Sequence, residues 1–250
     1  MAEIAGNPAA LQSHAIRLRG LPERVFRHRG TRADLGVLKQ MFDAEHYALR
    51  RLKRGAELVA LYRGMVARGE RPLIVDAGAN IGGSVVYFAL HFPRAHIVAL
   101  EPAANNFAVL EANAAGLDVD LRRAAIGARD GEARLVDPGE GEWGYRVQSG
   151  GGGGGEQMPV LAASRLVAEQ RAAGCRPFIA KIDIEGGEAE LFSADTGWVD
   201  EFPLLIIELH DWLLPRSASS RSFLQCIAGL ERDFVFIGEN VFSIGNKWTA

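Results

Sequence analysis

After Pro72, short apolar runs alternate along the chain with segments of helical periodicity, a pattern that few folds accommodate. The runs typical of buried strands lie at 73–78, 96–102, 119–127, 178–184 and 204–211, with a short extra one at 132–137. The helical patterns lie at 82–93, 104–116 and 219–232. This alternation predicts an α/β fold with a mostly parallel sheet and helices on both faces. We expect the segment 233–245 to form a hairpin that adds an antiparallel strand.

The segment before this alternation has a different pattern. From residue 31 to about residue 69, apolar residues recur at helical spacing and predict two or three helices. We therefore expect residues 1–70 to form an N-terminal segment and helical cap, and residues 71–250 to form the main domain. The amphipathic helices at 31–68 offer a face for a homodimer as readily as a lid.

A glycine-rich insert interrupts the main domain at 137–160, where six consecutive glycines occupy 150–155. Such a run loses much conformational entropy when ordered, so it predicts a mobile loop. We favour a passive insert over a lid for this loop. Trp143 and Tyr145 precede the glycines and are candidates for stacking on an acceptor, although cross-strand packing explains them almost as well.

Composition excludes several classes of protein. The chain is 48% hydrophobic and 24% charged, which is typical of soluble globular domains. Its net charge of −3 gives no electrostatic reason to expect nucleic acid or an anionic membrane as a partner. The two cysteines are far apart, and the first residues lack the apolar core of a signal peptide. We expect a cytoplasmic protein without a membrane span.

The first strand leads into a glycine-rich turn, DAGANIGG at 76–83. A dinucleotide fingerprint would have a glycine where Asn80 stands, so close approach to a pyrophosphate is compromised. Glu101 ends the second strand, where a carboxylate can accept from both ribose hydroxyls of a nucleoside. A glycine turn with a ribose acid suits S-adenosylmethionine, which has no phosphate, better than NAD. Asp76 is expected to face the ammonium group of that cofactor.

The motifs VDAGANIGGSVVYFA, IVALEP, KIDIEGGEAELF and LLIIELH together resemble the FkbM-type S-adenosylmethionine-dependent methyltransferases. The resemblance covers about residues 73–211 and implies a Rossmann-like, seven-stranded class I methyltransferase sheet. It also implies O-methylation of a sugar or natural-product hydroxyl, with a small molecule or glycoside as acceptor. Gly187, where the family usually has alanine, and the polyglycine insert depart from the pattern. The expected cofactor-binding residues are Asp76, Gly78, Asn80, Gly82, Ser84, Glu101, Pro102, Asn106, Ala125 and Asp183.

The stretch FIAKIDIEGGEAELF at 178–192 carries charged residues inside an apolar run. Strand alternation places Asp183 and Glu185 on one side at the carboxyl tip, beside the expected cofactor. His210 ends the next strand, and we predict that it is the general base, with Asp183 and Glu185 positioning the acceptor hydroxyl or the cofactor. Glu188 is expected to interact with a helix N-terminus, and Lys181 with a neighbouring carboxylate such as Glu208.

Other interpretations stay open at this point. Asp183, Glu208 and Asp211 form an alternative Mg²⁺ site, which we do not favour over a metal-free mechanism. A small-molecule N-methyltransferase is the nearest rival, since an amine acceptor makes His210 dispensable. A non-catalytic nucleoside-binding protein is a second rival. An NAD(P)-dependent oxidoreductase is a third, against which Asn80 argues. Tyr47, in the expected cap, is a candidate for closing over the cofactor, although helix packing explains it better.

Overall fold

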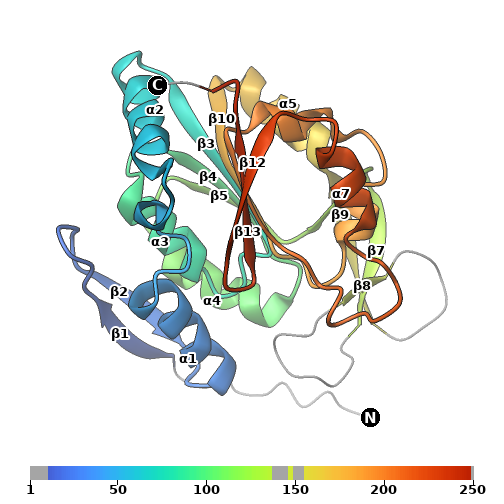
Figure 1. The fold of residues 1–250 in the computed structure, drawn as a ribbon. Helices are drawn as coiled ribbons and strands as arrows, with labels where there is room; N and C mark the ends of the chain where they lie inside the picture. The colour runs from blue at the N-terminus through green and yellow to red at the C-terminus, as the bar shows by residue number, and fades with distance from the viewer. Residues whose placement is uncertain (1–10, 137–145, 149–154, 249–250) are drawn as a thin grey trace, which may run out of the picture.

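The computed structural model describes residues 11–136, 146–148 and 155–248. Its centre is a seven-stranded sheet with the order β12-β13-β11-β10-β3-β4-β5 (Figure 1). These strands are β3 (Arg71–Ala77), β4 (His96–Leu100), β5 (Val119–Arg122), β10 (Cys175–Ile182), β11 (Leu204–Glu208), β12 (Arg232–Ile237) and β13 (Asn240–Gly245). Within this sheet the neighbouring strands β11, β10, β3, β4 and β5 pair in parallel, whereas β13 is antiparallel to both β11 and β12. The predicted mostly parallel sheet with an antiparallel terminal hairpin is confirmed.

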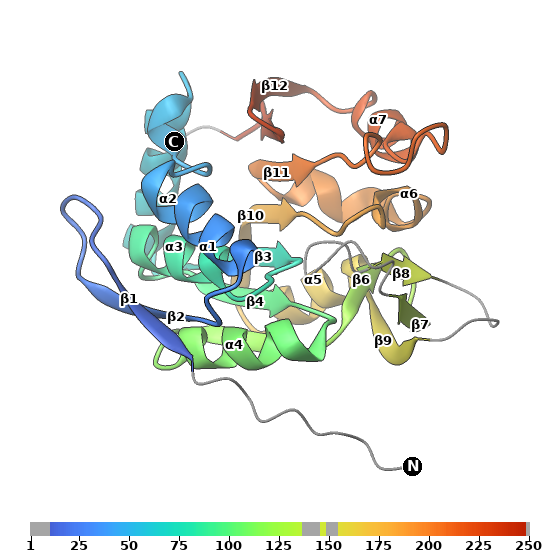
Figure 2. The same cartoon turned by 90° about the horizontal axis from the view of Figure 1, so that it is seen from below.

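Each face of this sheet packs against its own set of helices, which is why the strands are apolar on both sides. Alternation within β3 shows the division: Ile74 belongs to one core cluster, and Leu73 and Val75 belong to the other. The first cluster contains side chains of α2 (Gly55–Ala67), α3 (Gly83–His91) and α4 (Ala104–Ala114). The second contains side chains of α5 (Ala163–Ala172), α6 (Glu188–Leu191) and α7 (Arg221–Ile227), on the opposite side of the sheet in Figure 2.

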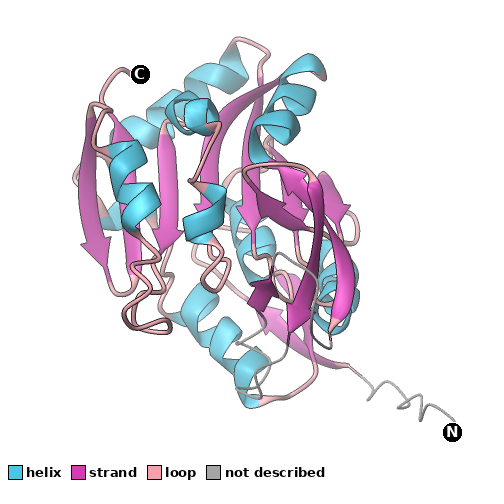
Figure 3. Cartoon of the chain, turned by 90° about the vertical axis from the view of Figure 1, so that its right-hand side faces the viewer, coloured by secondary structure: helices cyan, strands magenta, loops and turns pink. Residues whose placement is uncertain are grey.

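A smaller, four-stranded sheet lies beside the carboxyl ends of the main strands, on the side that faces the viewer in Figure 3. It contains β6 (Ala125–Gly127), β7 (Gly131–Val136), β8 (Arg146–Gln148) and β9 (Glu156–Ala162), in the order β6-β9-β7-β8. The sequence predicted one strand over 119–127, but a turn in which the Ala124 amide donates to the Arg122 carbonyl divides it. The extra strand at 132–137 is confirmed as β7, whereas β9 was not predicted.

The expected helical cap is only partly correct. Residues 12–28 form a hairpin of β1 (Gln12–Ile16) and β2 (Arg24–His28), which the sequence analysis missed. Helices follow it, as predicted: α1 (Arg32–Leu38), a π-helix (Lys39–Asp43), a short 3₁₀-helix (Leu49–Arg51) and α2. The hairpin forms because Phe26 and His28 alternate with exposed residues and turn inward, where Phe26 packs against Phe42 with ring centroids 5.4 Å apart.

The N-terminal elements share a core with the main sheet, since Met41 and Leu58 belong to the same buried cluster as Ile74. Tyr47 is buried and stacks on Phe88, with ring centroids 5.5 Å apart. Homodimerisation through this segment stays a prediction. Residues 150–154 of the glycine run, Trp143 and Tyr145 lie outside the described residues. Within the described part of the chain, no helix is long and apolar enough to cross a membrane.

Candidate active site

A cavity of about 230 Å³ lies where the carboxyl ends of β3, β4 and β10 face the smaller sheet. This is the edge at which open parallel sheets bind ligands. The lining residues are Gly78, Asn80, Leu100, Glu101, Pro102, Asn106, Ala124, Ala125, Ile126, Arg129, Asp130, Gly131, Glu132, Val160, Asp183, Ile184, Glu185, Gly187 and Glu190.

Most of the expected cofactor-binding residues line this cavity, namely Gly78, Asn80, Glu101, Pro102, Asn106, Ala125 and Asp183. Asp76, Gly82 and Ser84 do not line it. Asp76 and Ser84 are buried, and Gly82 is the N-cap residue of α3, with a φ of 89°. These three residues therefore lie in or next to the turn without lining the cavity, and their contact with the cofactor stays a prediction.

The turn after β3 requires glycine at position 78. Gly78 has a φ of 78°, and an added Cβ would lie 1.7 Å from the carbonyl oxygen of Asp183. The chain thus brings the tips of β3 and β10 into backbone contact, which also appears in the hydrogen bond from the Asp183 amide to the Ala77 carbonyl. Asn80 adopts a φ of 50°, which asparagine tolerates better than most residues. Its backbone amide donates to Glu101 Oε2.

Glu101 is fixed at the end of β4 by two backbone donors. Its Oε2 accepts from the Asn80 amide and its Oε1 accepts from the Ala103 amide, both at 2.9 Å. Burial raises the pKa of Glu101 to about 7, although these two hydrogen bonds oppose the increase. Each carboxylate oxygen retains a lone pair for a further donor. This geometry is compatible with Glu101 accepting from two neighbouring ligand hydroxyls, and that role stays a prediction.

Asp76 has a different partner from the one expected. It is fully buried, its Oδ2 accepts from Ser84 Oγ at 2.5 Å, and its Oδ1 lies 3.2 Å from Lys181 Nζ. Asp76 therefore pairs with a lysine of the protein rather than facing the ammonium of a ligand. Lys181 also donates to the Gly78 carbonyl at 2.5 Å and lies 3.5 Å from Asp183 Oδ2. The expected ion pair between Lys181 and a carboxylate of a neighbouring strand is thus confirmed, but the partner is Asp76 on β3, with Asp183 as a second, and not Glu208.

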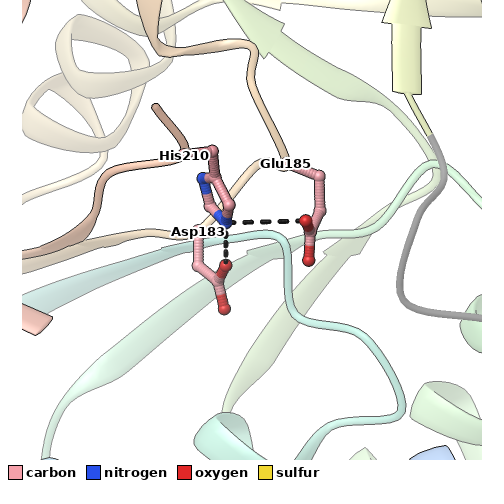
Figure 4. Close-up of side chains that lie close together, drawn as sticks. All are labelled: Asp183, Glu185 and His210. Carbon is pink, nitrogen blue, oxygen red and sulfur yellow. Dashed lines mark ion pairs between the residues drawn. The ribbon is translucent and has the colours of Figure 1, made fainter. Parts of the chain in front are cut away.

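A second group of charged side chains gathers where β10 and β11 end. Figure 4 shows the ring of His210 directed toward the carboxylates of Asp183 and Glu185. His210 Nε2 lies 3.7 Å from Asp183 Oδ1 and 3.5 Å from Glu185 Oε2. Glu208 Oε1 is a third neighbour of the same nitrogen, at 3.6 Å. Glu185 reaches this position because its φ of 52° reverses the chain just beyond β10.

The other ring nitrogen of His210 is held by Glu188. Nδ1 donates to Glu188 Oε1 at 2.8 Å, and both side chains are almost completely buried. Glu188 lies in the first turn of α6, as predicted, and accepts from the Gly186 amide there, but its contact with the histidine ring was not predicted. This hydrogen bond fixes the ring so that Nε2 points at Asp183, Glu185 and Glu208.

The environment changes the protonation of this group. Burial disfavours the charged ring, but the hydrogen bond and charge of Glu188, with Asp183 and Glu185, outweigh it and raise the pKa of His210 to about 9. Burial, followed by the charge of Asp183, raises the pKa of Glu185 to about 8. A charged imidazole cannot accept a proton, and His210 does not line the cavity. The role of His210 as general base stays a prediction, and both observations weigh against it.

The alternative metal ligands do not all converge. Asp211 Oδ1 accepts from the Ser220 amide at 3.5 Å. Among the described residues, one atom each of Asp183, Glu185 and His210 lie within 4.8 Å of one another. Asp183 and Glu185 were predicted as catalytic partners of His210, but the three residues were not predicted as a set of metal ligands.

Four charged residues that were not predicted from the sequence also line the cavity, brought there by the smaller sheet and α6: Arg129, Asp130, Glu132 and Glu190. No spacing in the sequence connects them to the glycine turn. With them, the lining contains six acidic residues, Glu101, Asp130, Glu132, Asp183, Glu185 and Glu190, against the single base Arg129. The cavity therefore favours a ligand with net positive charge and disfavours a pyrophosphate.

The sheet order, the glycine turn and the acid at the end of β4 define a Rossmann-like class I methyltransferase. A family comparison agrees: residues 76–235 match the methyltransferase FkbM domain, and the chain belongs to this family. The family implies S-adenosylmethionine as methyl donor. A comparison with curated proteins finds no significant match.

Several solved methyltransferases are similar to this chain. A co-crystal structure of WbdD with a kinase inhibitor is 14% identical, with a TM-score of 0.41, and the match covers 76% of this chain and 40% of that one. A putative O-methyltransferase from Klebsiella pneumoniae is 14% identical, with a TM-score of 0.40 and coverage of 85% and 96%. A putative caffeoyl-CoA O-methyltransferase from Staphylococcus aureus is 13% identical, with a TM-score of 0.38 and coverage of 85% and 97%.

Proposed function

We propose that this chain transfers a methyl group from S-adenosylmethionine to a hydroxyl of a small molecule, such as a natural product or a sugar. The observation that carries the proposal is the position of Asp183 and Glu185, which line the same cavity as Glu101 and have His210 behind them. This arrangement supports the proposal, because the residues expected to hold the nucleoside and those suited to a hydroxyl and its proton line one cavity.

The residues present fit the cofactor. S-adenosylmethionine has a sulfonium and an ammonium group against one carboxylate, so its net positive charge matches the acidic lining. Glu101 would hold the ribose hydroxyls, and the polar side chains of Asn80 and Asn106 would contact the rest of the nucleoside. When bound, the cofactor supplies a methyl group whose bond to sulfur breaks as a bond to the acceptor oxygen forms.

The protein's contribution is to align the acceptor and to remove its proton. Asp183 and Glu185 face the cavity and would contact the acceptor hydroxyl, whereas His210, which is 1% exposed, would act through them as a positioning residue. An amine acceptor has less need of Asp183, Glu185 and His210 to remove a proton. The number of side chains that gather here therefore favours O-methylation over N-methylation.

An exposed aromatic residue suggests how the acceptor is held. Trp212 follows the charged group in the chain, is 65% exposed, and has its ring centroid 6.2 Å from that of His210. A large exposed aromatic side chain beside a site suits the flat face of a sugar or an aromatic ring. We expect Trp212→Ala to raise the KM for the acceptor while the affinity for S-adenosylhomocysteine stays the same.

Calorimetric titration with S-adenosylhomocysteine, and with NADH in parallel, tests the cofactor. We expect micromolar binding of S-adenosylhomocysteine only, lost in Glu101→Ala. Binding of NADH instead would exclude the proposal.

Incubation with isotopically labelled methyl donor and matched hydroxyl and amine acceptors then tests the reaction by mass spectrometry. His210→Ala should reduce turnover of hydroxyl acceptors far more than affinity for the cofactor product. Labelling of amines alone would identify an N-methyltransferase, and no labelling of any acceptor would favour a non-catalytic binding protein.

A further inference from the structure

We propose that Asp183, Glu185 and His210 form a binding site for a divalent transition-metal cation, such as Mn²⁺ or Zn²⁺, with Glu208 as a third acidic residue beside it. The inference deepens the proposed function and rests on it only for the chemical purpose of the metal. Metal binding itself can be measured without any methyl transfer.

The first observation is an unpartnered nitrogen. His210 is 1% exposed, and its Nε2 is buried without a hydrogen-bond partner. The three nearest acceptors, on Asp183, Glu185 and Glu208, lie at 3.7, 3.5 and 3.6 Å. Each distance exceeds that of a hydrogen bond, for which an N–H donor and an oxygen lie about 2.7–3.2 Å apart. The nitrogen is thus aimed between these carboxylates rather than bonded to one of them.

The second observation is the spacing itself. Two ligand atoms that each lie about 2.1 Å from one cation in a tetrahedral arrangement are about 3.4 Å apart. The separations of 3.5 and 3.7 Å from Nε2 to Glu185 and Asp183 are close to this value. One atom each of Asp183, Glu185 and His210 also lie within 4.8 Å of one another. A single cation between them can therefore contact all three with small side-chain shifts.

The third observation is the support behind the histidine. Glu188, which is fully buried, accepts from Nδ1 at 2.8 Å, so a cation that displaces the proton of Nε2 would find the lone pair on that nitrogen. A carboxylate behind a histidine in this way is a common arrangement in metal sites, where it fixes ring orientation and increases ligand basicity. Asp183 is likewise oriented, since Lys181 lies 3.5 Å from its Oδ2 and leaves Oδ1 toward the ring.

The donor set selects the class of cation. Mg²⁺ and Ca²⁺ prefer oxygen ligands throughout, whereas imidazole suits zinc and other transition metals. One imidazole and two carboxylates also leave coordination positions open, and Asp183 and Glu185 line the cavity through which an ion or an acceptor oxygen would arrive. A cation here would orient the acceptor hydroxyl and lower its pKa, which is the task that O-methylation requires.

The test uses the full-length protein after dialysis against EDTA, titrated with MnCl₂ and followed by the electron paramagnetic resonance signal of free Mn²⁺. We expect one bound Mn²⁺ per chain, displaced by Zn²⁺, and weaker binding of Mg²⁺. Asp183→Asn and Glu185→Gln, which are isosteric changes at partly exposed residues, should each weaken Mn²⁺ binding by about tenfold or more. Asp211→Asn is the matched control, because this neighbouring acid lies outside the group, and it should bind Mn²⁺ like the wild type.

Absence of saturable binding, tighter binding of Mg²⁺ than of Mn²⁺, or equal affinity in all four proteins would overturn the proposal. Circular dichroism of each variant verifies folding, and Glu208→Gln replaces any variant that does not fold. S-adenosylhomocysteine is titrated into the same samples. Cofactor binding without metal binding rejects the metal site and leaves the proposed function intact, whereas metal binding without cofactor binding supports the metal site and rejects the proposed function.

Discussion

His210 and Glu188, which are 22 residues apart in the chain, are joined by a hydrogen bond of 2.8 Å in the interior of the protein. His210 comes from the end of β11 and Glu188 from the first turn of α6, and neither side chain is more than 1% exposed. The pair connects the two elements that follow β10 and β11. This hydrogen bond also orients the ring so that Nε2 faces Asp183, Glu185 and Glu208.

The pair predicts a large loss of stability when the acid is removed. Glu188→Ala leaves a buried histidine without its partner, and breaking a buried charged pair from one side costs about 3–5 kcal/mol. We expect the free energy of unfolding in urea to fall by an amount in this range. Asp200→Ala, which breaks the exposed pair with Lys247, is the control and should cost less than about 1 kcal/mol. A similar cost for both variants would mean that His210 finds another partner.

The contact between the tips of β3 and β10 predicts a position-specific effect of glycine replacement. Gly78→Ala places a Cβ 1.7 Å from the Asp183 carbonyl oxygen, so it should separate the two strand tips and abolish binding of S-adenosylhomocysteine. Gly116→Ala is a matched control, since Gly116 has a φ of 77° but no atom within 4 Å of an added Cβ. It should cost only about 1–2 kcal/mol from backbone strain. Thermal unfolding and calorimetry compare the two, and equal losses would show that strain alone acts at position 78.

Lys181 and Asp76 should behave as a coupled pair. Lys181→Met leaves Asp76 charged and fully buried without a cation, and should destabilise the fold by about 3–5 kcal/mol. The double variant Lys181→Met with Asp76→Asn removes both charges and should recover much of that loss. The free energies of unfolding of the wild type, Lys181→Met, Asp76→Asn and the double variant complete a double-mutant cycle. Additive losses would mean that the two side chains do not interact.

Glu101 predicts a pH dependence of stability. Burial raises its pKa in the folded chain to about 7 from an ordinary value of 4.5, so the fold favours the protonated form. This contribution is fully present below pH 4.5 and is lost as the pH rises through 7, with a difference of about 3 kcal/mol. Glu101→Gln cannot titrate. The stability of the wild type should therefore fall relative to this variant between pH 4.5 and 7.

Urea unfolding of both proteins at several pH values across this interval measures the effect, since the other titrating groups are common to both. Parallel profiles for the wild type and Glu101→Gln would contradict the shift. The experiment is done without ligand, because S-adenosylhomocysteine would stabilise the folded state by itself.

Much of the fold could be predicted because its signals are local. The run LIVDAG has apolar side chains on both faces and ends in a glycine, and this is what a buried strand and a tight turn require. The hairpin over 12–28 was missed because its alternation, with Phe26 and His28 inward, is short and is flanked by charged residues. Strand β9 was missed because it follows a glycine run and because its pairing partners, β6 and β7, are known only from the tertiary structure.

The sequence established the chemistry of the strand tips: which residues there have carboxylates, where the glycine turn must lie, and that Glu101 ends the second strand. Tertiary structure decided the partners, since strand order and register are long-range properties. Lys181 lies between two strands and is in register with Asp76 on β3 but with Ile206 on β11, so it pairs with Asp76 and not with Glu208. In the same way, only the packing of α6 beneath the end of β11 brings Glu188 to His210. A pattern in the sequence specifies the face on which a side chain lies, and the neighbouring strand or helix determines what that side chain contacts.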